Sequence, residues 1–411
     1  MARTPASSAS RSAGPAAPVR SSAVRESQAG QLDIDGLLAD RAVDIIVCCG
    51  SGGVGKTTTA AALALRAAEQ GRKVCVLTID PARRLAQSMG LTELDNTPRP
   101  VKGVDTAAGG SLDAMMLDMK RTFDEVVETA ASPEKAKEIL ENPFYVALSS
   151  SFSGTQEYMA MEKLGQLHND PASRWDLIVV DTPPSRSALD FLDAPERLSS
   201  LLDGRFMRVM VAPARGPARI LTAGLSMVTG AMTKVLGGEF LSDVQAFIAA
   251  LDTIFGGFRQ RAEATYRLLQ ADETAFLVVA APEPDAIREA AYFAERLTSE
   301  GMPLAGLVVN RFHTRAGRSI SAADAESGAR RLAADGLDDA ATATAELLLV
   351  HAERVRRSQR EERVSARFTA AHPKVPTVAV PALPTDIHDL DGLREIGELL
   401  GGGELFAVTD A

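Results

Sequence analysis

The feature that most constrains this chain is a glycine-rich segment directly after an apolar run. The run Ile45–Cys49 is followed by Gly50–Thr57 (GSGGVGKT), and an alanine-rich helical pattern begins at once. The segment satisfies G-x-x-x-x-G-K-[ST], the pattern of phosphate-binding loops that join a strand to a helix. Its glycines let backbone N–H groups converge on phosphate oxygens, and the helix N-terminus adds its positive end. The strand–loop–helix context favours this interpretation over a simple tight turn.

The side chains of this loop predict a nucleoside triphosphate bound with Mg²⁺. Lys56 is expected to reach the β- and γ-phosphates, and Thr57 is expected to offer its hydroxyl to the metal. The residues expected to contact ATP in this loop are Gly52, Gly53, Val54, Gly55, Lys56, Thr57 and Thr58.

Short apolar runs alternate with helical patterns from Asp44 onward. The runs predict seven strands, at Ile45–Cys49, Val74–Ile79, Ala114–Leu117, Leu177–Val180, Phe276–Ala280, Leu304–Val309 and Thr377–Val380. Most are continuously apolar, as strands buried on both faces should be. A helix is predicted over 283–299, where apolar residues recur at helical spacing. The alternation predicts an α/β fold, with a doubly wound, mainly parallel sheet and helical insertions.

Two aspartates follow predicted strands. Asp80 ends the second run, and Asp181 ends the fourth. The carboxyl ends of parallel strands meet at the edge of the sheet where α/β proteins bind ligands. We expect Asp80 to position the attacking water, and Asp181 to hold Mg²⁺ directly or through water. An aspartate after a strand is often only a helix cap, so this prediction depends on the phosphate loop beside it.

The composition outside these motifs divides the chain into a tail and one domain. Residues 1–30 are rich in Ser, Ala, Pro and Arg, which predicts a disordered tail, with a transit peptide as the alternative. Residues 31–411 predict a single ATPase domain. Helical insertions are expected at about 118–170 and 195–272, and a charged helical segment is expected at about 315–367.

Charge and cysteine usage exclude several other classes of protein. A formal net charge of −10 argues against nucleic acid as a partner. The uncharged stretch Ile220–Thr233 has 14 residues, whereas a membrane span needs about 20. Cys48, Cys49 and Cys75 lie in apolar runs without a C-x-x-C pair, and the histidines are scattered. We therefore expect a cytoplasmic protein with reduced thiols and no transition-metal site formed by protein ligands alone.

Four segments in chain order resemble the ArsA family of ATPases. They are the glycine-rich loop, the D-P-A tripeptide that begins at Asp80, the stretch Gly154–Tyr158 (GTQEY), and the loop Asp181–Pro184 (DTPP). The likeness extends over about residues 42–400. It is greatest to the members with a single phosphate loop, which are often described as anion-transporting ATPases.

The resemblance implies roles for particular residues. Asp80 would lie in a first switch loop and orient water, and Asp181 would begin a second switch loop. Asn310, at the end of the run Leu304–Val309, would contact adenine. The loop Pro381–Pro384 would close over the base, which places Pro381 and Leu383 among the nucleotide contacts.

The resemblance also implies an Mg-dependent ATPase that acts as a nucleotide-gated dimer. The dimer would be a homodimer, or a heterodimer with an ArsA-type paralogue, and it would bind a hydrophobic client or a membrane partner. One alternative is a weakly active regulatory subunit of a heterodimeric ATPase. Another is an ATPase subunit that docks on an anion transporter, which would place the protein peripherally at the membrane.

Three departures from the family pattern bear on these alternatives. Ser51 occupies the position where family members usually carry a lysine that reaches the partner subunit's nucleotide, so activation in trans by this chain is in doubt. The cysteines lie in predicted strands rather than in the helical region, which argues against activation by a metalloid. The zinc-binding C-x-x-C that joins some dimers of the family is absent.

Two segments leave alternatives open. The segment 203–240 is rich in methionine and carries an apolar helical face, which fits either a core-facing helix or a pliable client-binding groove. The charged segment carries Arg354, Arg356, Arg357, Arg360 and Arg363 interleaved with glutamates. A solvated helix face with ion pairs is the favoured interpretation there, and a site for an anionic partner is the alternative.

Overall fold

The computed structural model describes residues 30–80, 84–91, 93–142, 145–146, 156–170, 175–183, 260–314, 320–334 and 339–402. The predicted tail up to residue 29 and the segment 203–240 lie outside the described residues, as do most of the second insertion and the first two residues of the stretch Gly154–Tyr158.

Within these residues, eight strands form one sheet, in the order β3-β4-β2-β5-β1-β6-β7-β8. The strands are β1 (Ile45–Cys49), β2 (Lys73–Thr78), β3 (Arg99–Pro100), β4 (Ser111–Met116), β5 (Leu177–Asp181), β6 (Thr274–Ala280), β7 (Leu304–Phe312) and β8 (Thr377–Pro381). Every neighbouring pair is parallel except β3 and β4. The predicted doubly wound, mainly parallel α/β sheet is confirmed.

The sheet differs from the prediction at its β3 edge. The strand β4 begins at Ser111 rather than Ala114, because the buried Asp113 interrupts the apolar run in the sequence. The indole Nε1 of Trp175 donates a hydrogen bond of 2.7 Å to the Asp113 carboxylate, so the charge is tolerated inside the strand. The two-residue strand β3 was not predicted, since it is too short to show a pattern.

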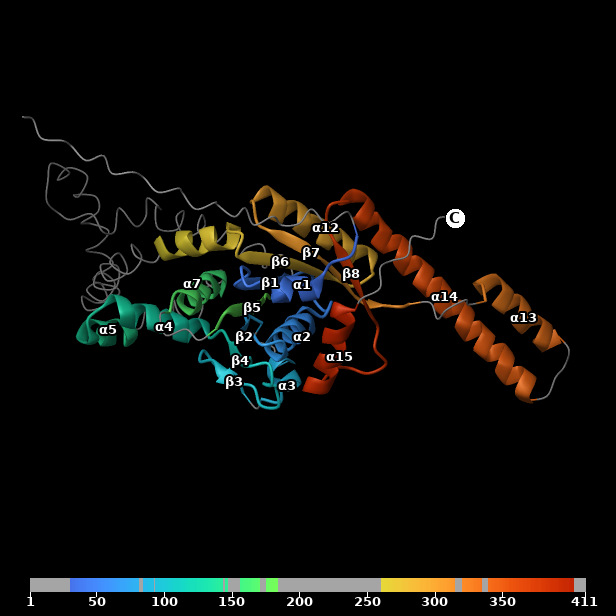
Figure 1. The fold of residues 1–411 in the computed structure, drawn as a ribbon, viewed down its shortest axis with the longest axis horizontal. Helices are drawn as coiled ribbons and strands as arrows, with labels where there is room; N and C mark the ends of the chain where they lie inside the picture. Colours follow the sequence, from blue (N-terminus) through green and yellow to red (C-terminus); the bar gives the residue numbers. More distant parts are fainter. Residues whose placement is uncertain are drawn as a thin grey trace, which may run out of the picture.

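Helices cover both faces of the sheet (Figure 1). In β1, Ile45, Val47 and Cys49 pack in one hydrophobic cluster, whereas Ile46 and Cys48 pack in the other. The helices of the first cluster are α4 (Met119–Ala130), α5 (Pro133–Leu140), α7 (Gln156–Asn169), α12 (Pro284–Ser299) and the carboxyl end of α14 (Asp339–Ala371), which contributes Phe368. Those of the second are α1 (Ile34–Ala39), α2 (Lys56–Glu69), α3 (Arg84–Ser88) and α15 (Leu390–Gly401). Burial on both faces accounts for the continuously apolar strands.

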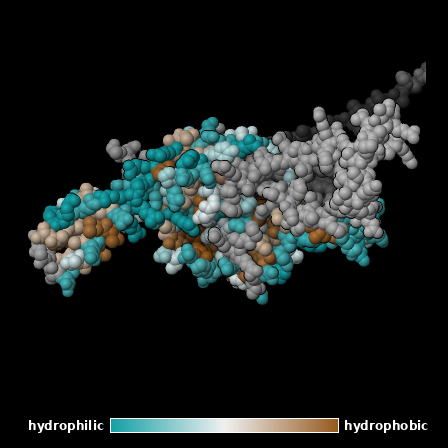
Figure 2. Space-filling view, turned by 180° about the vertical axis from the view of Figure 1, so that it is seen from behind, coloured by the Kyte–Doolittle hydropathy of each residue, from teal (hydrophilic) through white to brown (hydrophobic). Residues whose placement is uncertain are grey.

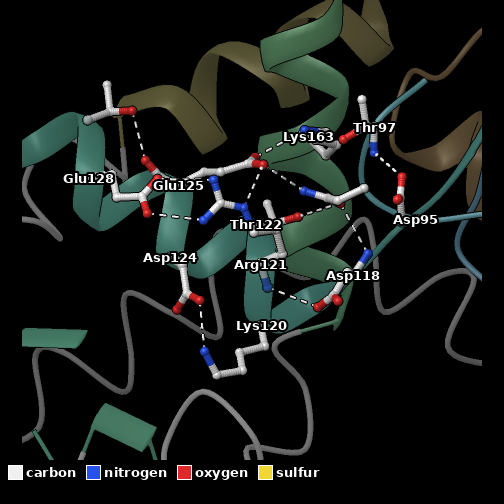
Figure 3. Close-up of polar contacts among 12 residues, drawn as sticks. Asp95, Thr97, Asp118, Lys120, Arg121, Thr122, Asp124, Glu125, Glu128 and Lys163 are labelled. Carbon is white, nitrogen blue, oxygen red and sulfur yellow. Dashed lines mark hydrogen bonds and ion pairs between the residues drawn. The ribbon is translucent and has the colours of Figure 1, made fainter. Parts of the chain in front are cut away.

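A polar network fastens the first insertion to the rest of the domain (Figure 3). Glu125 of α4 accepts hydrogen bonds from Asn96 Nδ2 at 3.1 Å and from Lys163 Nζ of α7 at 3.0 Å. The Asn96 side-chain oxygen accepts from the Asp118 backbone N–H and from the Thr122 hydroxyl. The start of α4 is therefore held by both α7 and the loop that precedes β3.

Two further helices form an arm that projects from the sheet (Figure 1). They are α13 (Ala322–Ala334) and the 33-residue α14 (Asp339–Ala371), and they occupy the predicted charged segment. Ala325, Ala352 and Val355 form a small core between them. Figure 2 shows the arm from behind, with hydrophobic residues among hydrophilic ones. No helix in the described part of the chain is both long and apolar enough to cross a membrane.

Candidate active site

The carboxyl ends of the parallel strands surround a cavity of about 910 Å³, which we call the phosphate cavity. Its walls come from the β1–α2 loop, the end of β2, α3, β7 and the segment after β8. Ten of the residues predicted to bind or hydrolyse a nucleotide line it: Gly52, Gly53, Gly55, Lys56, Thr57, Thr58, Asp80, Asn310, Pro381 and Leu383. Of the other two, Asp181 is fully buried and does not line the cavity, and Val54 lines a neighbouring cavity.

Two glycines of the loop meet geometric demands that no other residue satisfies. Gly50 has a φ of 148°, and a Cβ there would lie 2.1 Å from the backbone oxygen of Val279. Gly55 has a φ of 95°, and a Cβ there would lie 2.2 Å from the side-chain nitrogen of Asn310. Since real Cβ atoms do not approach other atoms so closely, and both φ values favour glycine, the loop lies this close to Val279 and Asn310 because it has glycine at both positions.

Lys56 is the first residue of α2, and it is buried beneath the loop. Its Nζ donates a hydrogen bond of 2.8 Å to the backbone oxygen of Ser51. Burial lowers the pKa of Lys56, and the Asp181 and Asp80 carboxylates oppose this shift. The ammonium group is therefore held in a partly desolvated position where a negatively charged ligand would stabilise it.

Asp181 is the last residue of β5, and it lies opposite Thr78 of β2 in the parallel register. Its Oδ2 accepts a hydrogen bond of 2.9 Å from the Thr78 hydroxyl. Its Oδ1 is buried and accepts no hydrogen bond within the described residues. Burial raises the pKa of Asp181 to about 6, against the opposing effects of the Thr57 and Thr78 hydroxyls and the Lys56 ammonium.

Asp80 lies two residues beyond the end of β2 and lines the phosphate cavity. Its backbone N–H donates a hydrogen bond of 3.2 Å to the Thr78 hydroxyl, which also contacts Asp181. The carboxylate of Asp80 raises the pKa values of both Lys56 and Asp181, so all three charges act within one electrostatic environment. Asp80 is only half-buried, unlike Asp181.

The structure corrects the expected position of Asn310. The strand β7 does not end before this residue but continues to Phe312, with an irregular register between Val309 and Phe312. The Asn310 Nδ2 donates a hydrogen bond of 2.9 Å to the backbone oxygen of Val54, so the side chain supports the phosphate loop as well as lining the cavity. The irregular register escaped the prediction because the apolar run ends at Val309.

Sequence reasoning missed Arg311, which also contacts the loop. Its NH1 donates a hydrogen bond of 3.0 Å to the backbone oxygen of Gly53. Its φ is 62°, and it is the only residue other than glycine with a positive φ among those the structure describes. An arginine after an apolar run gives no sequence signal for this conformation, because glycine and asparagine are the residues that usually adopt it.

The donor set at the base of the cavity fits Mg²⁺. The Thr57 hydroxyl and the buried Asp181 Oδ1 are oxygen ligands of the kind that Mg²⁺ prefers, and it usually binds through few protein ligands plus phosphates. No group of three or more His, Cys, Asp and Glu side chains suited to a metal ion occurs in the described part of the chain. Cys48, Cys49 and Cys75 are buried and form no disulfide within the described residues.

Comparison with known proteins identifies related ATPases. A family model described as "Anion-transporting ATPase" matches residues 43–323, which is more than half of the chain. The protein "ATPase GET3" of Ajellomyces dermatitidis is 26% identical over 282 residues, covering 68% of this chain and 75% of that relative. "ATPase GET3C" of Arabidopsis thaliana is 26% identical over 271 residues, covering 64% of this chain and 65% of that relative.

A shorter match reaches a third kind of relative. The "Arsenical pump-driving ATPase" of Acidiphilium multivorum is 32% identical over 158 residues. This match covers 38% of the present chain and 26% of the relative.

Proposed function

This chain is an ATPase that belongs to the anion-transporting ATPase family, and from that premise we propose that Mg·ATP is hydrolysed in the phosphate cavity. Lys56 would bind the β- and γ-phosphates, and Thr57 and Asp181 would hold the metal, which neutralises charge on the phosphates when bound. Asp80 would orient the attacking water. Asn310, Pro381 and Leu383 would form the wall that receives the base.

The observation that carries this proposal is the unsatisfied carboxylate of Asp181. A buried carboxylate without a partner for one oxygen is costly, and a protein retains it where a cation will occupy the site. The Thr57 hydroxyl acts on the same carboxylate, and this residue follows the lysine of the phosphate loop. Lysine, hydroxyl and carboxylate thus gather where a phosphate-bound Mg²⁺ would need them.

Asp80→Asn tests the catalytic part of the proposal. Asparagine keeps the size of the side chain but loses the negative charge that orients water, so ATP binding is expected to remain within about threefold of wild type. Single-turnover hydrolysis should fall by about 100-fold or more, as expected for loss of a group that acts on the nucleophile. Lys56→Ala is the control that loses binding itself. Normal turnover in Asp80→Asn would remove this residue from its proposed role.

We further propose that the protein acts as a nucleotide-gated dimer that binds a hydrophobic client or a membrane partner. The name of the arsenical pump-driving relative supports a partner of the second kind. Ser51 lies on the loop where the family pattern has lysine, which favours a heterodimer whose other subunit supplies that lysine. The alternatives are a weakly active regulatory subunit and an ATPase subunit of an anion transporter.

One pull-down separates these alternatives. Asp80→Asn, held with ATP, is used to capture proteins from native cytosol and membranes, and Lys56→Ala serves as the matched control without bound nucleotide. ATP-dependent capture of a protein with a single apolar helix would indicate client binding. Capture of a complete transporter would indicate docking. An ATP-dependent paralogue that raises turnover when mixed with the wild-type chain would indicate a heterodimer. A fully active homodimer by sedimentation would contradict the heterodimer.

A further inference from the structure

A second cavity of about 910 Å³ lies against the phosphate loop, and we call it the arginine cavity. The loop residues that line it are 51–54, and the start of α12 forms another wall. Five arginines line it as well: Arg311, Arg357, Arg360, Arg363 and Arg367. Gly52, Gly53, Arg311 and Arg357 line both this cavity and the phosphate cavity. The two cavities therefore adjoin at these four residues.

Four of these arginines form one face of α14. They recur at spacings of three, three and four residues, which places them along a single side of a helix. Arg357 forms an ion pair of 3.0 Å with Glu361, and Arg363 Nε donates to the backbone oxygen of Gln359. Within the described residues, Arg360 and Arg367 have no ion pair or hydrogen bond from their guanidinium groups. Both side chains are exposed, as the favoured sequence interpretation of a solvated helix face expects, but they take no part in its ion pairs.

Acidic residues line the same cavity, so its wall carries both charges. Glu283, Asp285 and Glu289, at the start of α12, line the opposite wall. Asp285 pairs with Arg288 of its own helix, and no ion pair in the described part of the chain joins these carboxylates to the arginines of α14. The guanidinium groups of Arg360 and Arg367 thus remain available to a ligand that enters between the walls.

Arg311 adds a positive charge at the boundary between the two cavities. Its left-handed backbone conformation costs about 1 kcal/mol for a residue with a Cβ, and glycine would avoid that cost. The guanidinium group donates to Gly53 on the wall that both cavities share. Retaining arginine here keeps a cation beside the arginine face.

We propose that the arginine cavity is a second binding site for a small oxyanion of the phosphate class, distinct from the phosphate cavity. Guanidinium groups match such oxyanions because their planar N–H donors form paired, charge-assisted hydrogen bonds. Arg360 and Arg367 supply the principal contacts, and Arg311 completes the positive wall at the loop. The site does not require that ATP be hydrolysed in the phosphate cavity.

Calorimetric titration of the full chain with inorganic pyrophosphate tests this proposal. Wild type is expected to show two classes of site per chain. Lys56→Ala should lose the class in the phosphate cavity and keep the other. The double variant Arg360→Gln/Arg367→Gln should keep the first class and weaken the second by about tenfold or more, since two charge-assisted contacts are lost.

A matched control separates local contacts from net charge. Arg331→Gln/Arg354→Gln removes two exposed arginines of the arm that do not line the cavity, and it should leave both classes unchanged. Retention of the first class in each arginine variant shows that the protein is folded. The proposal would be overturned if wild type showed one class of pyrophosphate site and Lys56→Ala abolished it. It would also be overturned if pyrophosphate affinity at the second class of site fell equally in both double variants. If Lys56→Ala removed neither class, the assignment of the phosphate cavity would fail instead.

Discussion

One buried ionisable side chain lies at the amino ends of strands β1, β2 and β5, and another lies at their carboxyl ends. The protein supplies a full set of hydrogen-bond partners to only one of them. At the amino ends, Arg72 is 1% exposed. It donates to the backbone oxygens of Leu38, Asp40 and Val43 and to both the backbone and the carboxylate of Asp176. At the carboxyl ends, Asp181 is 0% exposed, and one of its oxygens accepts no hydrogen bond within the described residues.

The difference between the two ends separates stability from function. A buried charge with a full set of partners fixes the elements around it, whereas one without them costs free energy in the absence of a ligand. Arg72 joins the segments that enter three strands, so we assign it to the stability of the fold. The cost at Asp181 is removed only when a cation binds, so we assign it to nucleotide binding. Substitutions at the two ends test this difference.

The largest expected effect is on stability, at the amino ends. Arg72→Met leaves three backbone oxygens and Asp176 without a buried donor, so the free energy of unfolding should fall by about 3–5 kcal/mol in denaturant titration. Arg41→Met is the matched control, because Arg41 pairs with the same Asp176 but is 56% exposed. It should cost less than about 1 kcal/mol. Equal losses in both variants would contradict the contrast.

Lys56→Ala should show the opposite pattern at the carboxyl ends. Nucleotide affinity is expected to fall by about 100-fold in a fluorescent-nucleotide titration, because the buried ammonium no longer meets the phosphates. The free energy of unfolding without nucleotide should change by less than about 1 kcal/mol, since the cost of burying the ammonium offsets its hydrogen bond to Ser51. A large loss of stability with unchanged affinity would make Lys56 a structural residue.

The smallest effect concerns a half-exposed ion pair between α1 and α2. Arg66 holds the pKa of Asp35 below its ordinary value, with Gln70 adding a hydrogen bond. A lowered pKa stabilises the folded state above about pH 4, and this contribution is lost as pH falls through the folded-state pKa. Asp35→Asn should therefore cost less than about 1 kcal/mol at pH 7, and the difference from wild type should shrink as the pH falls below about 4. A difference independent of pH would exclude this ion pair as its source.

Much of the site at the carboxyl edge of the sheet could be predicted, because its residues belong to short, contiguous sequence motifs. The loop Gly50–Thr57 is contiguous, and Asp80 and Asp181 directly follow apolar runs, so topology alone brings them to one edge. The partners of Asp181 were not predicted, since Thr78 meets it only through the register of two strands distant in sequence. Asn310 was assigned only through a family resemblance, and its bond to the phosphate loop depends on the irregular end of β7.

Features that depend on contacts between distant segments could not be predicted from the sequence. Arg72 precedes a strand like many surface arginines, and its burial arises from three chain segments that converge on it. The arginine face of α14 was recognised as a charged segment, but helical spacing does not show which neighbour it faces. Likewise, an arginine in the left-handed region, as at Arg311, has no sequence signature.

Asp181→Asn tests the central contrast most directly, when the unfolding free energy and ATP turnover are measured on the same preparation. The substitution replaces a buried carboxylate, whose pKa is raised to about 6, with a neutral amide. At pH 7 without nucleotide, a rise of about two in this pKa corresponds to about 3 kcal/mol, so the free energy of unfolding should rise by about 1–3 kcal/mol once the cost of burying the amide is subtracted. Mg-dependent turnover should fall by about 100-fold or more, because the carboxylate ligand is lost. A variant that is less stable and still hydrolyses ATP at the wild-type rate would contradict the account.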